Sequence, residues 1–268
     1  MTQENVEPVG AKEVTEEITI TRFDRQLTIP GFGPGEQEKL RQATVLVAGI
    51  GGLGGTAATY LAAAGVGRLV LVHPGALELP DLNRQTLMLP EWLGRTRVDC
   101  AALTLRAHYP DVEVDALPWH LDDPGMPELI ASADLVVDAR HNFPERFLIN
   151  RMCVDAGRPL VVSAMNATEG FMLTVLPGAP CLRCVFAAGD PSWKPLGFPV
   201  MGAVAGTAGC LAAMDAIKVI TGFGRPAVGR MVTFDLWDNA FRTVRTHRDP
   251  ACPDCSSHSG ETGPGDAG

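Results

Sequence analysis

Two Cys-x-x-Cys pairs constrain the fold of this chain more than any other feature. The first pair is Cys181 and Cys184, and the second, far along the sequence, is Cys252 and Cys255. Each pair supplies two sulfurs from one tight turn, and four thiolates suit tetrahedral zinc. A metal held in this way fastens the two segments together, so the last third of the chain must fold back on itself. Four thiolates leave no open coordination position, and the expected zinc site is therefore structural.

The other three cysteines, the net charge and the apolar stretches narrow the class of protein further. Cys100, Cys153 and Cys210 lie within apolar segments, where we expect core residues, and this pattern favours a reducing compartment over a disulfide framework. A net charge of −9 without a Lys/Arg stripe argues against nucleic acid as a partner. The acidic N-terminal residues do not resemble a signal peptide, and the apolar stretch 200–211 is too short to span a membrane. We expect a cytoplasmic protein.

A glycine-rich turn opens the first third of the chain. Gly49, Gly51 and Gly52 follow the apolar run 45–48 and precede the small-residue stretch 56–64. This order predicts a strand, a tight turn and a helix N-terminus, where backbone N–H groups and the helix dipole receive phosphate. Glycine at these positions would let a nucleotide approach the backbone closely. The turn alone also fits a dinucleotide site or simple packing of a helix on a sheet.

Strand and helix patterns alternate after this turn, and their spacing predicts a parallel sheet with right-handed crossovers. We therefore expect a doubly wound, Rossmann-like α/β fold with a nucleotide beyond the carboxyl ends of the strands. From residue 170 the regular alternation of strand and helix patterns ends, which predicts an antiparallel extension that carries the zinc site. Predicted strands lie at 44–48, 68–72, 112–117, 134–138, 159–164, 171–176, 231–235 and 241–246, and predicted helices at 52–64, 95–108, 125–132, 144–157 and 202–221.

The 268 residues are expected to hold one domain with ample core. Residues 1–18 are acidic and without periodicity, which predicts a disordered arm. Residues 19–255 carry the alternating elements and both cysteine pairs. Residues 256–268 are polar and rich in glycine, and we expect a disordered tail there.

Several segments together resemble one family. They are Arg22-Phe-Asp-Arg-Gln26, the glycine turn, Asp81-Leu-Asn-Arg-Gln-Thr86, Val136-Val-Asp138 and the two cysteine pairs. From about Arg22 to Cys255 the chain resembles the ThiF/MoeB/HesA family, bacterial relatives of ubiquitin-activating enzymes. The resemblance implies that residues 19–255 are an adenylation domain that works as a homodimer. Such a domain uses ATP to activate the C-terminal carboxylate of a ubiquitin-like sulfur-carrier protein or a peptide.

The resemblance also assigns roles to three arginines, which we expect to serve catalysis. Arg84 matches the family's ATP-phosphate arginine, and Arg25 matches the arginine that reaches the ATP of the other subunit. Arg97 stands where the family carries a lysine near the phosphates. Carboxylate attack on the α-phosphate builds negative charge on phosphate oxygens, so positive groups must already point there.

Three further positions depart from the family pattern and are expected around the nucleotide. His73 replaces the aspartate that holds the ATP ribose, and Asp81 replaces an asparagine. His141 replaces an aspartate placed to hold magnesium, and two alternatives follow: the retained Asp138 holds this ion instead, or arginines carry the phosphate charge without it. Imidazole suits magnesium poorly because the ion prefers oxygen ligands. A cysteine that some members carry is missing from the loop 193–199, so we expect no covalent step through that loop.

Three functions stay open from these residues. An ATP-dependent adenylyltransferase is the leading hypothesis, and Arg84 and the glycine turn favour it. The second is a pseudoenzyme, a dimeric scaffold that binds a carrier protein or peptide without ATP turnover; His73 and His141 favour this one. An NAD(P)-dependent oxidoreductase would explain the glycine turn, but such enzymes want an acidic residue at the position of His73, and the cysteine pairs would have no role.

Overall fold

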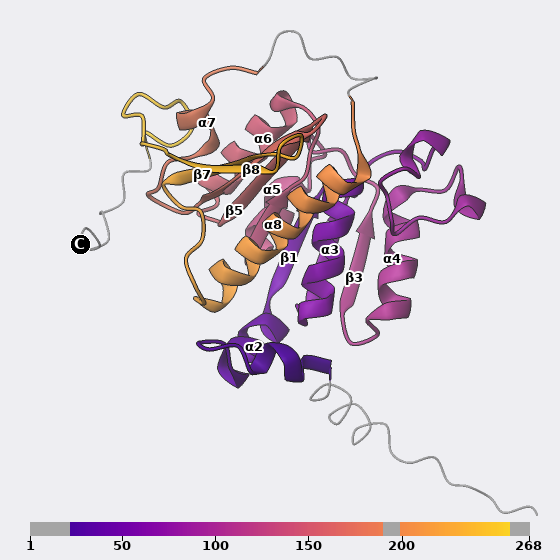
Figure 1. Cartoon of the computed structure of the whole chain (residues 1–268). Helices are drawn as coiled ribbons and strands as arrows, with labels where there is room; N and C mark the ends of the chain where they lie inside the picture. The colour runs from indigo at the N-terminus through magenta and orange to yellow at the C-terminus, as the bar shows by residue number, and fades with distance from the viewer. Residues whose placement is uncertain (1–21, 190–198, 258–268) are drawn as a thin grey trace, which may run out of the picture.

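The computed structural model describes residues 22–189 and 199–257, which form one eight-stranded sheet with helices on both faces (Figure 1). The strand order is β3-β2-β1-β4-β5-β6-β7-β8. Neighbouring strands from β3 to β5 pair parallel, whereas β6, β7 and β8 join antiparallel at the edge beyond β5. The predicted α/β class with a largely parallel sheet is confirmed.

Each predicted strand and helix is present, with ends within two residues of those expected. The strands are β1 (Thr44–Ala48), β2 (Arg68–Val72), β3 (Glu113–Leu117), β4 (Leu135–Asp138), β5 (Leu160–Asn166), β6 (Glu169–Val175), β7 (Arg230–Asp235) and β8 (Ala240–Arg245). The helices are α2 (Pro34–Gln42), α3 (Gly52–Ala64), α4 (Arg97–His108), α5 (Met126–Ser132), α6 (Phe143–Asp155), α7 (Leu182–Val185) and α8 (Gly202–Thr221), with short 3-10 turns η1 (Leu79–Asp81) and η2 (Pro90–Trp92).

Side-chain alternation along the central strand β1 separates two cores. Val45 and Val47 pack in the core that also contains α3, α4 and α8, whereas Leu46 and Ala48 pack in the core with α5 and α6. Successive side chains of a strand point to opposite faces, so a strand that is apolar throughout must be covered on both. This requirement explains why the helices wind around both faces of the sheet.

Helix α8 lies along α3, and a glycine allows the close approach (Figure 1). A Cβ on Gly209 would lie 2.5 Å from the carbonyl oxygen of Leu53, so a larger residue would push the two helices apart. By length and composition α8 could cross a bilayer, but Ala205, Ala208 and Ala212 are fully buried within the domain. We therefore describe α8 as a core helix that covers one face of the sheet.

The three cysteines outside the Cys-x-x-Cys pairs divide into two groups. Cys100 and Cys153 are buried, as predicted. The prediction of a core position for Cys210 is wrong, because this residue is exposed. Only one side of α8 faces α3 and the sheet, and the other side, which carries Cys210, faces outward. Apolar neighbours in sequence did not reveal which side a cysteine occupies.

Three sequence predictions fall on segments that lie outside the described residues. These are the acidic arm at 1–18, residues 258–268 of the predicted tail, and residues 193–198 of the loop without the family's cysteine.

Candidate functional site

A cavity of about 1370 Å³ opens where the carboxyl ends of β1, β2 and β4 meet. Strand order reverses here, since the chain goes from β1 to β2 on one side and β4 pairs with β1 on the other. Such switch points are the usual ligand sites of open α/β sheets. The cavity brings together seven of the predicted site residues, namely Gly51, Gly52, His73, Asp81, Arg84, Arg97 and His141. Gly49 and Asp138 do not line it but support the segments that do.

The glycine turn allows a ligand to approach the start of α3. Gly49 has a φ of +107°, and a Cβ there would lie 2.6 Å from the carbonyl oxygen of Ala139. A Cβ on Gly52 would lie 2.9 Å from Cγ of Arg84, so glycine is needed for the arginine to lie over the turn. Among the residues that the structure describes, no side chain caps the N-terminus of helix α3. Its first N–H groups and the positive end of its dipole therefore suit an anion such as phosphate.

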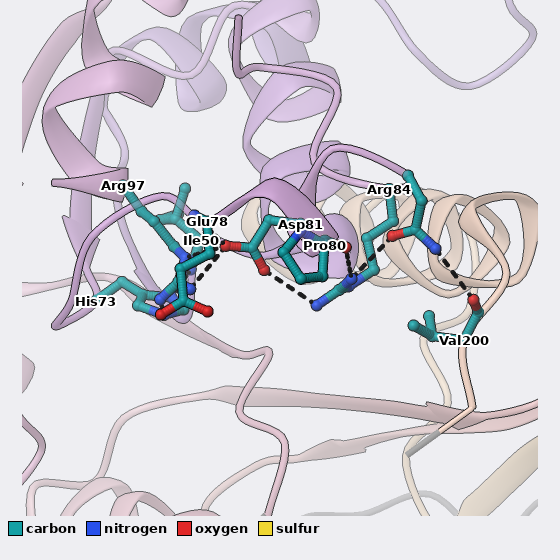
Figure 2. Close-up of polar contacts among 9 residues, drawn as sticks. Ile50, His73, Glu78, Pro80, Asp81, Arg84, Arg97 and Val200 are labelled. Atoms are coloured by element: carbon teal, nitrogen blue, oxygen red, sulfur yellow. Dashed lines mark hydrogen bonds and ion pairs between the residues drawn. The ribbon is translucent and has the colours of Figure 1, made fainter. Parts of the chain in front are cut away.

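Asp81 fixes the two arginines beside this turn (Figure 2). Its Oδ2 accepts hydrogen bonds from Arg97 Nε at 3.0 Å and Arg97 Nη2 at 2.7 Å. Its Oδ1 accepts one from Arg84 Nη2 at 3.2 Å, and Arg84 Nη1 also donates to the carbonyl oxygen of Pro80 at 2.9 Å. The carboxylate is buried at 5% exposure. Two positive charges thus share one negative charge in a fixed geometry, which gives these three side chains together a net positive charge.

His73 lies between the glycine turn and Arg97 (Figure 2). Its Nδ1 accepts a hydrogen bond from the backbone N–H of Ile50 at 2.7 Å, so the ring proton is on Nε2. Nε2 lies 3.3 Å from Arg97 Nη1. Burial, and next the charges of Arg140 and Arg97, lower the pKa of His73 well below its usual value, so the ring is neutral. Two donors therefore converge, and an acceptor oxygen of a ligand would satisfy both.

The end of β4 carries a second set of ion pairs. Asp138 is fully buried, and its Oδ2 accepts a hydrogen bond from Arg146 Nη1 at 3.0 Å while its Oδ1 accepts one from the backbone N–H of Arg140 at 2.9 Å. Burial raises the pKa of Asp138, and the Arg146 charge opposes this rise. The Arg140 side chain donates two hydrogen bonds to Glu145, at 3.0 and 2.8 Å. Burial, and next Arg140, lower the pKa of His141.

Gln85, Arg140 and Arg146 are among the residues that line the cavity and that the sequence predictions missed. Oε1 of Gln85 is buried and has no hydrogen-bond partner in the part of the chain that the structure describes. The two arginines lie in the polar run that follows β4, and that run was the signal that could have identified them. Their partners Asp138 and Glu145 are close in sequence, but the pairing depends on how α6 begins.

Arg25 lies far from the cavity of its own chain. It is exposed and does not line the cavity, and the neighbouring Gln26 donates to the carbonyl oxygen of Ala64 at 2.9 Å. Ala64 is the last residue of α3, whereas the cavity lies at the first. A helix of 13 residues spans about 20 Å. Any contact of Arg25 with a nucleotide therefore requires a second subunit.

The four cysteines of the two Cys-x-x-Cys pairs come together in a second site. Their sulfurs all lie within 4.8 Å of one another. Separations are 3.9 Å for Cys181 and Cys184, 3.6 Å for Cys181 and Cys252, and 3.4 Å for Cys184 and Cys255. Tetrahedral zinc with bonds near 2.3 Å places sulfurs about 3.8 Å apart, so this donor set fits the ion.

Helix α6 connects the cysteine cluster to the cavity. Asn150 is fully buried; its Oδ1 accepts from the backbone N–H of Leu182 at 3.0 Å, and its Nδ2 donates to Asp254 Oδ2 at 2.7 Å. One side chain thus contacts both cysteine turns. Arg146, four residues earlier on the same face of the helix, lines the cavity.

Comparisons with known proteins agree on one family. Residues 23–254 match the model of the ThiF family. The chain is 46% identical over 239 residues to "Protein HesA, heterocyst" of Trichormus variabilis, with 89% of each covered. It is 38% identical to the sulfur carrier protein adenylyltransferase of Thermus thermophilus, over 88% of this chain and 90% of that protein. A crystal structure of Escherichia coli MccB with MccA-N7isoASN shares the fold at a TM-score of 0.80 and 21% identity, covering 88% of this chain and 74% of that one.

Proposed function

Because this chain belongs to the ThiF family, we propose that it is an ATP-dependent adenylyltransferase that activates a C-terminal carboxylate. The acceptor is a ubiquitin-like sulfur-carrier protein or a peptide, and the name of the relative from Thermus thermophilus supports the first of these. One observation carries the proposal: Asp81 holds Arg84 and Arg97 beside the uncapped N-terminus of α3. Positive groups are thus in position before any nucleotide binds.

The chemistry requires this arrangement. A carboxylate oxygen of the acceptor attacks the α-phosphorus of ATP and forms a new P–O bond. The bond from that phosphorus to the bridging oxygen breaks, and pyrophosphate leaves with the electron pair. Negative charge grows on the phosphate oxygens, where fixed arginines and backbone N–H groups stabilise it without reorganisation. We assign Arg84 and Arg97 to this charge and the glycine turn to the phosphates, while His73 Nε2 donates to a ribose oxygen.

Two further parts of the proposal concern the assembly. Arg25 acts in the cavity of a second copy of the chain, because its own cavity lies at the far end of α3. The four cysteines hold one structural zinc, whose charge and geometry fasten the two cysteine turns to each other. Zinc takes no part in adenylate formation, since four thiolates leave it no open position.

A pseudoenzyme scaffold is the second candidate, and one observation favours it. His73 and His141 line the cavity where the family pattern has two aspartates. Loss of a charge-assisted hydrogen bond to the ribose would weaken the binding of ATP by about 1.5–3 kcal/mol. A working enzyme could tolerate this reduction in affinity. We therefore favour the adenylyltransferase, which the fixed arginines support, over the scaffold.

Calorimetric titration of zinc-loaded protein with ATP tests the proposal. We expect binding that Arg84→Ala reduces strongly and that Arg41→Ala, a change at an exposed arginine on α2, leaves unchanged. ATP–pyrophosphate exchange then follows with sulfur-carrier proteins and synthetic peptides ending in Gly-Gly. Exchange that depends on the acceptor and on Arg84 would support an adenylyltransferase. ATP binding without exchange for any acceptor would favour the scaffold, and no binding at millimolar ATP would contradict an ATP-dependent activity.

A further inference from the structure

Magnesium requires oxygen ligands that can turn toward the ion, and the acids at the carboxyl ends of β2 and β4 are already engaged. Asp138 uses one oxygen for Arg146 and the other for a backbone N–H. Asp81 is shared by two arginines. Glu145 accepts two hydrogen bonds from Arg140 and one from Asn142 Nδ2 at 2.6 Å. A metal at one of these carboxylates would compete with the arginine that already pairs with it, and leaving a buried arginine unpaired is strongly unfavourable.

The position that the family resemblance reserves for the magnesium aspartate holds His141, which lines the cavity. A neutral imidazole offers one nitrogen, whereas this small ion demands nearly octahedral oxygen coordination. Burial and the adjacent Arg140 lower the pKa of His141, which keeps the ring uncharged near neutral pH. His141 and the paired acids Asp81, Asp138 and Glu145 therefore do not fit magnesium.

Compared with the family pattern, the side chains of this site carry more positive charge, which is the charge that a bound cation would otherwise supply. Arg84, Arg97, Arg140 and Arg146 all line it. Relative to the family pattern, neutral His73 and His141 each remove one negative charge, and Asp81 adds one. The site is thus one charge more positive than the pattern, and its arginines are fixed by ion pairs beside the start of α3.

We propose that this cavity holds the phosphates of its nucleotide with arginine side chains and without a magnesium ion. The inference rests on the proposed function and specifies how the same site binds ATP. Glu78 also lines the cavity and is exposed, and its backbone N–H donates to Asp81 Oδ2 at 3.0 Å (Figure 2). Its carboxylate is used by none of the ion pairs described above and could still bind a metal, so Glu78 is included in the test.

The test is calorimetric titration with sodium ATP, with and without magnesium chloride. Buffers are freed of magnesium on a resin, because a soluble chelator would also remove zinc from the cysteine cluster. Metal analysis of each sample confirms that zinc is retained and magnesium is absent. We expect the Kd for ATP to change by less than about threefold between the two conditions, since no ligand in the site requires the ion.

His141→Asp is the sharpest variant, because it restores the acid and removes the proposed adaptation. We expect it to weaken magnesium-free ATP binding by about tenfold and to make binding respond to magnesium, since a carboxylate repels phosphate until a cation lies between them. His108→Asp is the matched control. It adds the same charge at the exposed far end of α4, and we expect no change in the Kd in either condition.

Two results would overturn the inference. Wild-type binding that requires magnesium would contradict it and leave the proposed function standing; loss of that requirement in Glu78→Gln would then identify the ligand. Absence of ATP binding in both conditions would contradict the inference and the proposed function together.

Discussion

The cysteine cluster and the arginine-rich cavity lie along one helix, α6, yet they are built in different ways. In the cluster, four cysteine side chains converge, and each would supply one sulfur ligand to the same metal ion. In the cavity, the buried charged groups are fixed by their partners: Asp81 by two arginines, and Arg140 by Glu145. A metal cluster can therefore be recognised from residue type and spacing. A charge network cannot, because its function depends on which groups pair.

Of the substitutions that distinguish the two regions, removal of a thiolate from the cysteine cluster should have the largest effect on stability. Cys252→Ser is expected to abolish zinc binding and to lower the free energy of unfolding by several kcal/mol, because structural zinc contributes about 10–16 kcal/mol of binding. Zinc content by elemental analysis and thermal unfolding measure the effect. Cys210→Ser, at an exposed cysteine of α8, should change neither. An unchanged melting temperature in Cys252→Ser would show that the cluster is not a structural metal site.

The link between the two regions can be weakened at Asn150. Asn150→Ala leaves the backbone N–H of Leu182 and the carboxylate of Asp254 without their buried partner. We expect a loss of about 2–4 kcal/mol in unfolding free energy, measured by denaturant titration.

Arg151 offers the matched control on the same helix. Its side chain is about half exposed and donates to the carbonyl oxygen of Pro253 at 2.6 Å. Arg151→Ala should lower the unfolding free energy by less than about 1 kcal/mol. Equal losses in the two variants would show that Asn150 has no special role in joining the cysteine turns.

A change at Arg97 tests whether the cavity depends on geometry as well as charge. Arg97→Lys keeps the charge but cannot contact Asp81 through two nitrogens as Nε and Nη2 do. We expect ATP to bind about tenfold more weakly, with little change in melting temperature, although lysine is the residue of the family pattern. Calorimetry measures the Kd for ATP, and Arg97→Ala shows how much affinity is lost when the charged side chain is removed altogether. ATP binding equal to wild type would show that a point charge is sufficient.

The smallest expected effect is a pH dependence of stability to which His73 of the cavity should contribute. Burial lowers the pKa of His73 well below its usual value near 6.5, so below that pH the unfolded chain takes up a proton that the folded chain does not. Stability is therefore fully present above about pH 6.5 and falls as the pH is lowered, by up to about 1.4 kcal/mol per pH unit for one group.

Denaturant titrations between pH 5.5 and 7.5 measure this slope. His73→Asn should reduce it, because an amide oxygen can still accept from Ile50 N–H but does not titrate. A slope that is the same in this variant would assign the dependence to other groups.

Much of the fold could be predicted from the sequence, and the errors have a physical cause. The predicted helices 52–64 and 202–221 match α3 and α8 because their patterns are local and uninterrupted. The misplaced Cys210 shows the limit, since an apolar helix gives little indication of which side packs inward. Arg140 and Arg146 were missed for a similar reason: only the folded start of α6 brings them to the cavity.

The amino-acid sequence by itself determined the order of strands and helices, the glycine turn and the four cysteines that converge, because period, spacing and residue type are properties of the chain. Only the tertiary structure decided that Asp81 serves two arginines, that Asp138 is committed to Arg146, and that Arg25 lies away from its own cavity. The role of a charged group depends on its burial and on the charges within a few ångströms, and these neighbours come from distant segments.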